Sequence, residues 1–253
     1  MTENEFEKIA NFLKEYIDVY GEDIFVDRDR ISKLITEIPD LEVVEQKMPA
    51  KPSKLTEKET PVRKSDAPLW AFMEEIKDCK NCPLWSTRTK FVFGDGNENA
   101  DIMFIGEAPG AEEDRTGIPF VGRAGQLLNK LLARINLKRE DVFIANILKS
   151  RPPNNRDPLP EEIAACIPYL YKQIELIQPK IIVALGRVAA QNLLNTTDTL
   201  KQMRGRIWQY RGVDMIVTYH TAAILRNGNL LNAAIEDFKF IMETYQNKLN
   251  KPE

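Results

Sequence analysis

The chain has 253 residues, of which 43% are hydrophobic and 29% are charged, so it resembles a globular protein with a sizeable core in one or two domains. No apolar run reaches the length of a membrane span, and the N-terminal sequence MTENEFEKIA lacks the basic start and apolar centre of a signal peptide. These features predict a cytoplasmic protein that makes no membrane contact.

The formal net charge of −3 is unevenly distributed along the chain. Residues 1–50 carry 13 acidic and 6 basic side chains, whereas residues 51–253 carry 25 acidic and 29 basic side chains. A mildly basic body with an acidic appendage is compatible with binding a polyanion. From charge alone, an ordinary solvated surface is equally compatible with these numbers.

The first elements in chain order belong to an N-terminal extension. Residues 3–20 place apolar side chains at helical spacing, and a second short helix is predicted around residues 29–37. Residues 45–68 are rich in Lys, Pro, Glu and Thr without an apolar period, which is typical of a flexible linker. We therefore expect a helical extension and linker over residues 1–65, a candidate segment for binding a protein partner, and a globular domain over residues 66–253.

Short apolar runs alternate with amphipathic segments through the rest of the chain. The predicted strands cover residues 101–106, 141–148, 180–186 and 214–220, and the predicted helices cover residues 125–135, 160–177, 187–194 and 229–246. This alternation predicts an α/β fold of three layers, α/β/α, around a central, mostly parallel sheet of four strands. Each strand runs into a polar or Gly/Pro-rich loop, so we expect four loops to meet at the carboxyl edge of the sheet, where such folds bind ligands.

Two of these loops contain small residues next to an aromatic side chain. GEAPG follows the first predicted strand, and RTGIPFVGRAG places Phe120 on a glycine-rich loop. Small residues allow a ligand to approach the backbone closely, but the same pattern also makes a tight turn. Phe120 is either a core residue or a platform on which a base stacks.

Three motifs in order behind the C-x-x-C of Cys79 and Cys82 carry a family resemblance. GEAPGAEEDRTGIPFVGRAGQLL, NILKSRPPNNRDPLPEE and HTAAILRN resemble the family 4 uracil-DNA glycosylases, the iron–sulfur type of bacteria and archaea. The resemblance runs from about Leu69 to Tyr245 and leaves the first 65 or so residues outside. It implies a uracil-DNA glycosylase-like domain that acts as a monomer on uracil in single- or double-stranded DNA. Such an enzyme flips the nucleotide out, cleaves its N-glycosidic bond and leaves an abasic site.

The resemblance also implies roles for the residues that line the uracil pocket. Asn146 would read the base, because an amide offers the donor and acceptor that suit O4 and N3–H of uracil but not cytosine. Phe120 would stack on the base, and Glu107, with Gly106 and Ala108 beside it, would position the attacking water or shape the backbone around O2. Without the motif, Asn146 would be taken for a residue that caps a strand.

His220, the one histidine in the sequence, matches the catalytic histidine of the family. Its imidazole N–H would donate to O2, where negative charge develops as the bond breaks. Many family members have proline after this histidine, whereas this chain has Thr221, which restores a backbone N–H and loosens the turn. No aspartate stands in the Glu107 loop, since Asp114 lies further on, so we expect a largely dissociative mechanism. The resemblance also assigns contacts with the DNA to Arg123, Arg151, Arg226 and Asn227.

The family's cluster is held by four cysteines, of which this chain keeps three. Cys79, Cys82 and Cys166 match, and Ser150 stands where the fourth is expected. A serine hydroxyl is a harder and poorer iron ligand than a thiolate. Three outcomes stay open: a 4Fe–4S cluster with Ser150 or water on one iron, a 3Fe–4S cluster on three thiolates, or loss of the cluster. We place a retained cluster first and zinc behind it, because structural zinc requires four Cys or His ligands.

A second function remains compatible with the sequence. The domain could be a glycosylase-fold DNA-binding or polymerase-associated module with weak or no catalytic activity. Intact Glu107, Phe120, Asn146 and His220 favour the enzyme, whereas Ser150 and Thr221 favour the module.

Overall fold

The computed structural model describes residues 67–250, which lie within one compact unit, Lys64–Glu253. The helices predicted at residues 3–20 and 29–37, and nearly all of the predicted linker, lie outside the described residues. The division of the chain near residue 65 stays a prediction. None of the helices within residues 67–250 combines the length and apolar character needed to cross a membrane.

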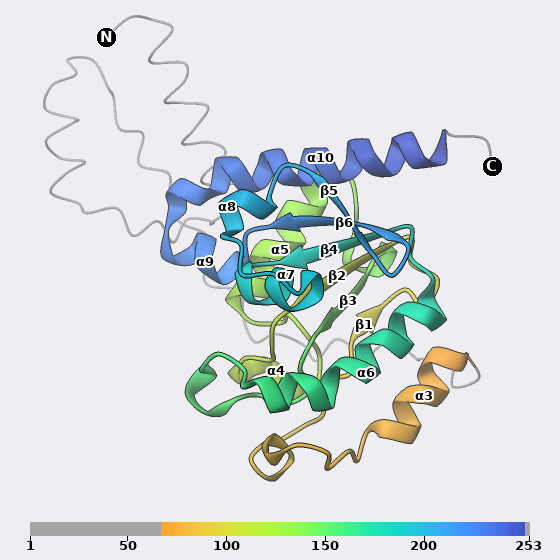
Figure 1. Cartoon of the computed structure of the whole chain (residues 1–253), viewed down its shortest axis with the longest axis vertical. Coiled ribbons are helices and arrows are strands. Elements are labelled where there is room, and N and C mark those ends of the chain that lie inside the picture. Colours follow the sequence, from red (N-terminus) through yellow and green to blue (C-terminus); the bar gives the residue numbers. More distant parts are fainter. Residues whose placement is uncertain (1–66, 251–253) are drawn as a thin grey trace, which may run out of the picture. The chain divides into compact units, whose positions relative to one another are not determined.

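A mixed sheet of six strands, in the order β1-β3-β2-β4-β6-β5, forms the centre of the described unit (Figure 1). Its four inner strands are parallel: β2 (Ile102–Gly106), β3 (Phe143–Asn146), β4 (Ile181–Leu185) and β6 (Val213–Thr218). They are the four predicted strands, and every residue of β2, β3 and β4 is buried, as expected of strands covered on both faces. The predicted α/β fold is therefore confirmed.

Two short edge strands were not predicted, and they pair antiparallel with the parallel core. They are β1 (Asp95–Gly96), which pairs with β3, and β5 (Ile207–Tyr210), which pairs with β6. β1 has two residues, and Ile207 and Gln209 of β5 are exposed, so neither segment has the buried apolar run that identified the inner strands.

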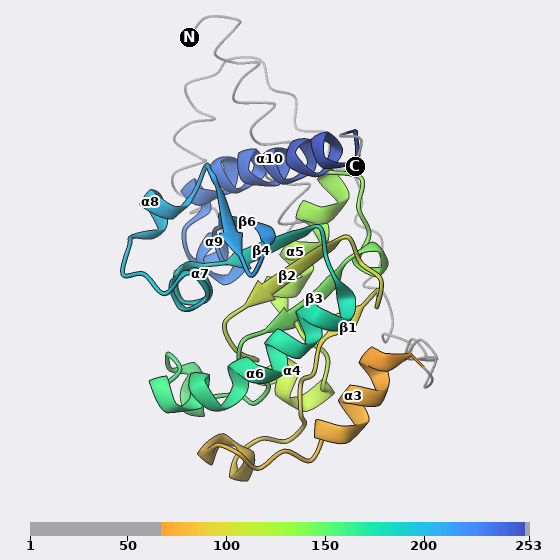
Figure 2. The same ribbon diagram turned by 45° about the vertical axis from the view of Figure 1, so that its right-hand side comes forward.

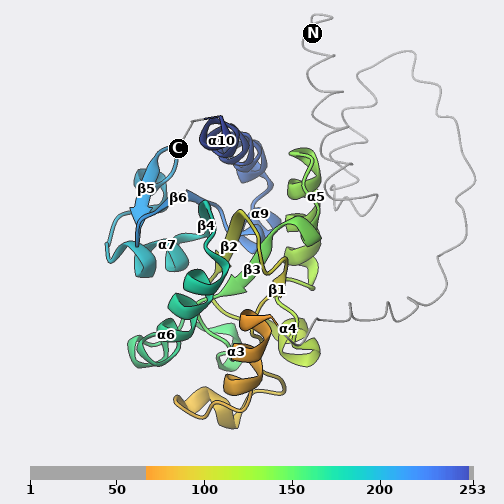
Figure 3. The ribbon, with the colours of Figure 1, turned by 90° about the vertical axis from the view of Figure 1, so that its right-hand side faces the viewer.

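Helices cover both faces of the sheet (Figure 3). On one face, Phe104 of β2 stacks on Phe238 of α10 with their ring centroids 5.9 Å apart. On the other, Met103 and Ile105 share a core with Leu170 of α6 and with residues of α3 and α7. The helices are α3 (Pro68–Ile76), α4 (Ala111–Thr116), α5 (Arg123–Arg134), α6 (Pro160–Ile177), α7 (Arg187–Leu194), α8 (Leu200–Met203), α9 (Thr221–Arg226) and α10 (Leu231–Leu249).

Helix α6 has the predicted bounds because its first turn carries strong start signals. Pro160 occupies the first helical position, where its missing N–H costs no hydrogen bond. The Glu162 carboxylate accepts a hydrogen bond from the Leu159 amide at 2.8 Å and pairs with Arg156 at 2.6 Å. The helix that follows β2 and its loops, α5, starts at Arg123, two residues before the predicted position.

The carboxyl ends of the four parallel strands lie at one edge of the sheet (Figure 2). β2 ends at Gly106, β3 at Asn146, β4 at Leu185 and β6 at Thr218. The segments that follow them carry every motif of the resemblance except the C-x-x-C. The fold therefore brings these motifs together, although they are far apart in the sequence.

Candidate active site at the carboxyl edge of the sheet

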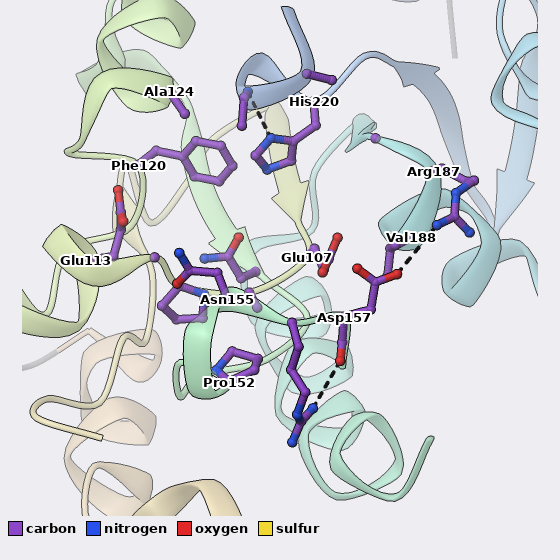
Figure 4. A pocket seen from close by; sticks show the side chains of 18 of the residues that line it. Glu107, Glu113, Phe120, Ala124, Pro152, Asn155, Asp157, Arg187, Val188 and His220 are labelled. Atoms are coloured by element: carbon purple, nitrogen blue, oxygen red, sulfur yellow. Dashed lines mark hydrogen bonds and ion pairs between the residues drawn. The ribbon is translucent and has the colours of Figure 1, made fainter. Parts of the chain in front are cut away.

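A cavity of about 520 Å³ opens at this edge, and residues from all four strand ends line it. Figure 4 shows the Phe120 and His220 rings on one side of the cavity and Glu107 and Asp157 on the other. Gly186 and Arg187, which follow β4, complete the wall. The volume falls within the range of small-molecule sites, which begin at roughly 300 Å³.

Phe120 forms a flat wall of the cavity from a backbone in the left-handed region, with φ of 52°. Its ring lies 5.5 Å from the His220 ring, with an interplanar angle of 32°. Gly106 makes this position possible, since a Cβ there would lie 2.7 Å from Phe120 Cζ. The aromatic ring is therefore held at the site, and it is not part of the main apolar core.

The side-chain oxygen of Asn146 is buried at the base of the cavity and has no hydrogen-bond partner among residues 67–250. Asn146 is 1% exposed, so bulk water does not replace the missing partner. An unpaired buried acceptor costs roughly 1–3 kcal/mol, which makes this atom a binding point for a ligand N–H. Its place at the end of β3 fits the reading role predicted from the motif.

His220 is the N-cap residue of helix α9, and this role fixes which of its nitrogens carries the proton. Its Nδ1 accepts a hydrogen bond from the Ala222 amide at 3.1 Å. Burial, followed by the positive charge of Arg226, lowers the pKa of His220 to about 4, so the imidazole is neutral at pH 7. With Nδ1 acting as acceptor, the proton resides on Nε2, which becomes a hydrogen-bond donor toward the cavity.

Thr221, the departure from the usual proline, leaves this arrangement intact. It occupies the first position of α9, where a backbone N–H has no acceptor inside the helix, so proline and threonine serve equally well. Its side chain is fully buried, and its hydroxyl oxygen has no hydrogen-bond partner among the described residues. The expected loosening of the turn relative to a proline-containing relative stays a prediction.

Glu107 follows β2 directly and faces a mixed group of charges. Burial, with the nearby Asp157 carboxylate adding to it, raises the pKa of Glu107 to about 7, while Arg187 and Arg226 oppose the shift. A carboxyl group with this pKa accepts or releases a proton near neutral pH. Asp114, in contrast, is buried outside the cavity lining and accepts hydrogen bonds from the Thr89 amide at 2.9 and 3.1 Å, which is a structural role.

Comparisons with known proteins agree with this geometry. Residues 93–239 match the family model described as the uracil DNA glycosylase superfamily. The chain is 48% identical over 180 residues to the type-4 uracil-DNA glycosylase of Archaeoglobus fulgidus, covering 68% of this chain and 90% of that protein. It is 49% identical over 184 residues to the type-4 enzyme of Sulfurisphaera tokodaii, covering 69% of this chain and 84% of the relative. The chain belongs to the type-4 group of the uracil DNA glycosylase superfamily.

A more remote relative of this glycosylase is a DNA polymerase of Bacillus phage SP01. The two are 29% identical over 159 residues, which is 62% of this chain but 17% of the polymerase. A segment similar to the glycosylase domain thus occurs within a much longer protein.

The predicted DNA contacts of the glycosylase divide into two groups. Arg226 lines the cavity at the end of α9, as does Ala108, a predicted uracil-binding residue, beside Glu107. Arg123, Arg151 and Asn227 lie outside the cavity lining, and Arg123 and Asn227 are exposed. Arg151 Nε donates to the side chain of Asn155 at 2.7 Å, and Asn155 does line the cavity. Contacts with DNA by these side chains stay a prediction.

The three cysteines are free thiols in two segments of the described chain, and two of them are buried. Within residues 67–250, no group of three or more Cys, His, Asp or Glu side chains is arranged to hold a metal ion. The thiols are nevertheless close enough to interact, since Cys82 and Cys79 add to the effect of burial that raises the pKa of Cys166 to about 11. Polar groups also surround the sulfur of Cys79, which accepts hydrogen bonds from the Tyr169 hydroxyl at 3.1 Å and from the backbone N–H of Asn81 at 3.4 Å.

Ser150 is 2% exposed, and its hydroxyl oxygen accepts a hydrogen bond from Arg88 Nη1 at 3.3 Å. The preceding residue, Lys149, is fully buried and donates from Nζ to the Asn146 carbonyl at 2.8 Å and to Gln173 Oε1 at 2.6 Å. Lys149 thus connects the strand end that carries Asn146 to helix α6, which carries Cys166.

Several residues of the site were not predicted from the sequence. Glu113, Asp157 and Arg187 line the cavity, and Lys149 supports Asn146 from behind. Glu113, Lys149 and Asp157 lie inside the quoted motifs, so their position in those motifs was a usable signal. Arg187 lies outside these motifs, and its position directly after the third predicted strand was the one indication that the sequence offered.

Proposed function

We propose that this chain is a DNA repair enzyme that flips uracil out of DNA and hydrolyses its N-glycosidic bond, leaving an abasic site. One observation carries the proposal: the unpaired, buried Asn146 oxygen faces a cavity that also contains a flat aromatic wall and a neutral histidine N–H. The Asn146 amide matches the hydrogen-bonding edge of uracil, the Phe120 ring matches its flat face, and the His220 N–H matches O2, where charge develops as the base leaves.

Base recognition follows from the Asn146 amide. Its unpaired oxygen accepts the N3–H of uracil, while the amide NH₂ is the donor that suits uracil O4. Cytosine has a lone pair at N3 and an amino group at position 4, so both pairings would fail and two buried polar groups would be left unsatisfied. Loss of buried hydrogen bonds of this kind is the strongest form of discrimination available to a binding site.

Bond cleavage needs a partner for the charge that develops on the base. When the bond between C1′ and N1 breaks, its electron pair moves to the uracil, so negative charge builds up on O2 and the sugar becomes an oxocarbenium ion. His220 Nε2–H donates to O2, and its low pKa keeps it a neutral donor with its position fixed by the Ala222 amide. Such a donor contributes roughly 3–4 kcal/mol to the transition state.

Glu107 completes the reaction from the opposite side of the cavity. In its ionised form it holds a water molecule near the sugar and accepts the proton that this water loses when it adds to C1′. Its carboxylate also stabilises the positive charge of the sugar ion. Phe120 stacks on the uracil ring throughout, and Arg226, with Arg123, Arg151 and Asn227, contacts the DNA backbone or the base stack.

Three thiolates are one ligand short of the four Cys or His that structural zinc requires, and thiolates are the usual ligands of iron–sulfur clusters. We infer that Cys79, Cys82 and Cys166 hold the cluster, as 4Fe–4S or 3Fe–4S, with Ser150 at the fourth position. Burial keeps Cys166 a neutral thiol in the absence of a metal, and a bound cation would favour its ionised form. The Ser150 hydroxyl accepts a hydrogen bond from Arg88 at 3.3 Å, and as a hard, weakly acidic group it would be a poorer fourth ligand than a thiolate. When bound, the cluster supplies a structural link between the Cys79–Cys82 segment and α6.

The decisive experiment uses end-labelled oligonucleotides with one uracil, either single-stranded or opposite guanine or adenine. We expect free uracil to be released and the strand to break after alkali, whereas strands with thymine or cytosine at that position stay intact. The double variant Asn146→Ala, His220→Ala is the matched control for contaminating activity. No uracil release by folded protein in molar excess over DNA would contradict the proposal.

A second candidate is a polymerase-associated DNA-binding module, as the similarity to a segment of the phage DNA polymerase indicates. It predicts DNA binding without base release in the same experiment. The N-terminal extension, for which a protein partner is proposed, lies outside the described residues.

A further inference from the structure

Arg139 lies behind the Phe120 loop, outside the motifs that carry the resemblance. It begins the short 3-10 turn Arg139–Asp141 that leads into β3, and its side chain is 22% exposed. Its Nη1 donates to the Phe120 carbonyl at 3.1 Å, and its Nη2 donates to the carbonyl of Pro119. Its Nε donates to the Asp95 carboxylate of β1 at 3.3 Å. All three nitrogens of the guanidinium are therefore engaged.

The loop that Arg139 holds has an unfavourable backbone conformation. Phe120 has a φ of 52°, a region that residues with a Cβ seldom occupy. The Phe120 carbonyl also packs on the first turn of α5 at Gly125, where a Cβ would lie 2.8 Å from Phe120 Cα. Such a conformation persists only when several contacts impose it.

Contacts of opposite charge hold the two sides of this loop. Arg139 binds the carbonyls of Pro119 and Phe120, whereas Glu113 Oε1 accepts hydrogen bonds from the amides of Val121 and Gly122 at 2.9 and 3.0 Å. The peptide units on either side of the Phe120 ring are thus fixed by charge-assisted bonds, which are stronger than neutral ones. The planar fork of arginine reaches two adjacent carbonyls at once, and the single ammonium of lysine does not reproduce that geometry.

We propose that Arg139 is a positioning residue for base stacking: its guanidinium, oriented by Asp95, holds the two carbonyls that set the angle of the Phe120 ring. The role rests on the proposed function, because the ring it orients is the one that stacks on the flipped uracil. Arg139 does not touch the cavity, so it acts only through Phe120.

The test is a double-mutant cycle between Arg139 and Phe120, read by single-turnover uracil excision. Arg139→Gln is expected to lower excision about 10- to 100-fold, from the loss of two charge-assisted bonds that hold the ring. Arg139→Lys should recover part of that loss. In a Phe120→Ala background, Arg139→Gln should lower the excision rate by less than about threefold, because no ring remains to be positioned.

Two controls separate positioning from general damage. Arg206 is an exposed residue directly before β5, and Arg206→Gln removes the same positive charge from the protein. This variant therefore shows how much of the loss in Arg139→Gln comes from weaker electrostatic attraction to DNA. Asp95→Asn removes the carboxylate that orients Arg139 but keeps both carbonyl bonds, and we expect a loss of roughly threefold, smaller than that of Arg139→Gln. Thermal unfolding of each variant shows whether it folds.

Hydrogen exchange tests the same idea without DNA. Amide exchange in residues 117–123 should be at least about tenfold faster in Arg139→Gln than in wild type, with no change in the strands of the core. Unchanged exchange there, or equal losses from Arg139→Gln with and without Phe120, would overturn the positioning role while leaving the proposed function intact. Wild-type protein that releases no uracil would overturn the proposed function, and the role of Arg139 with it.

Discussion

Replacing Glu107 with glutamine is expected to remove the dependence of uracil excision on pH near neutrality. The pKa of Glu107 is raised to about 7 by burial and by Asp157, so the carboxylate forms as the pH rises through that value. The ionised fraction increases from roughly 10% at pH 6 to roughly 90% at pH 8, which predicts about a tenfold rise in the excision rate. The single histidine does not contribute, because the pKa of His220 is about 4.

The neighbours of Glu107 allow the midpoint of this curve to be moved. Asp157→Asn removes the like charge and should shift the midpoint to lower pH, whereas Arg187→Gln should shift it to higher pH. As the pH rises through about 7, the free energy of unfolding should fall while the excision rate rises. A raised pKa favours the folded state below the usual pKa of glutamate, and that contribution is lost as the pH rises through about 7. Glu107→Gln should therefore lose less stability than wild type between pH 5 and pH 8.

The assay is single-turnover excision from single-stranded uracil DNA between pH 5.5 and pH 9, with Glu112→Gln as an exposed control on α4. Glu107→Gln should give a slow, flat profile, and Glu112→Gln should follow wild type. A Glu107→Gln profile with the wild-type midpoint would refute the assignment. The titrating group would then be sought at Lys149, whose pKa burial lowers to about 7.

Three further substitutions test the remaining parts of the site. Asn146→Asp should reduce the preference for uracil over cytosine about 10- to 100-fold, because the carboxylate lacks the amide donor, and an unchanged preference relative to exposed Asn129→Asp would argue against base reading. His220→Ala should slow single-turnover excision by roughly two to three orders of magnitude, and normal turnover in this variant would exclude His220 from the mechanism. Ser150→Cys should raise the iron content of anaerobically purified protein from about three toward about four per chain and slow its loss in air, while excision changes less than about threefold. Wild-type protein that stays colourless after reconstitution with iron and sulfide, yet cuts normally, would show that the cysteines hold no cluster.

The sequence predicted the inner sheet and four of the eight helices within residues 67–250 because local signals and tertiary burial agree in those segments. Helix α6 is an example, since Pro160 and Glu162 mark a start that the structure keeps. The edge strand β5 was missed because pairing with β6 stabilises it, and its exposed Ile207 and Gln209 carry no apolar period. Edge strands depend on a neighbour that is distant in sequence, so a local pattern does not reveal them.

In the candidate site too, local motifs predicted some residues, whereas features that depend on tertiary contacts were missed. The motifs located Glu107, Phe120, Asn146 and His220, and the structure places all four around one cavity. The proton position on His220 was not predictable, because it depends on a hydrogen bond from Ala222. Arg139 was missed because its partners, Asp95 and the carbonyls of the Phe120 loop, become its neighbours only after the strands have paired.

The N-cap bond of His220 makes helix α9 sensitive to acid. Protonation of the imidazole below about pH 4 would turn Nδ1 from an acceptor into a donor, and the Ala222 amide would lose its partner. The first turn of α9 would then be uncapped at the moment when the imidazole becomes charged. Because Arg226 is the last residue of this helix, the DNA contact proposed for Arg226 and the hydrogen-bond donor proposed for His220 would be lost together, as one cooperative unit.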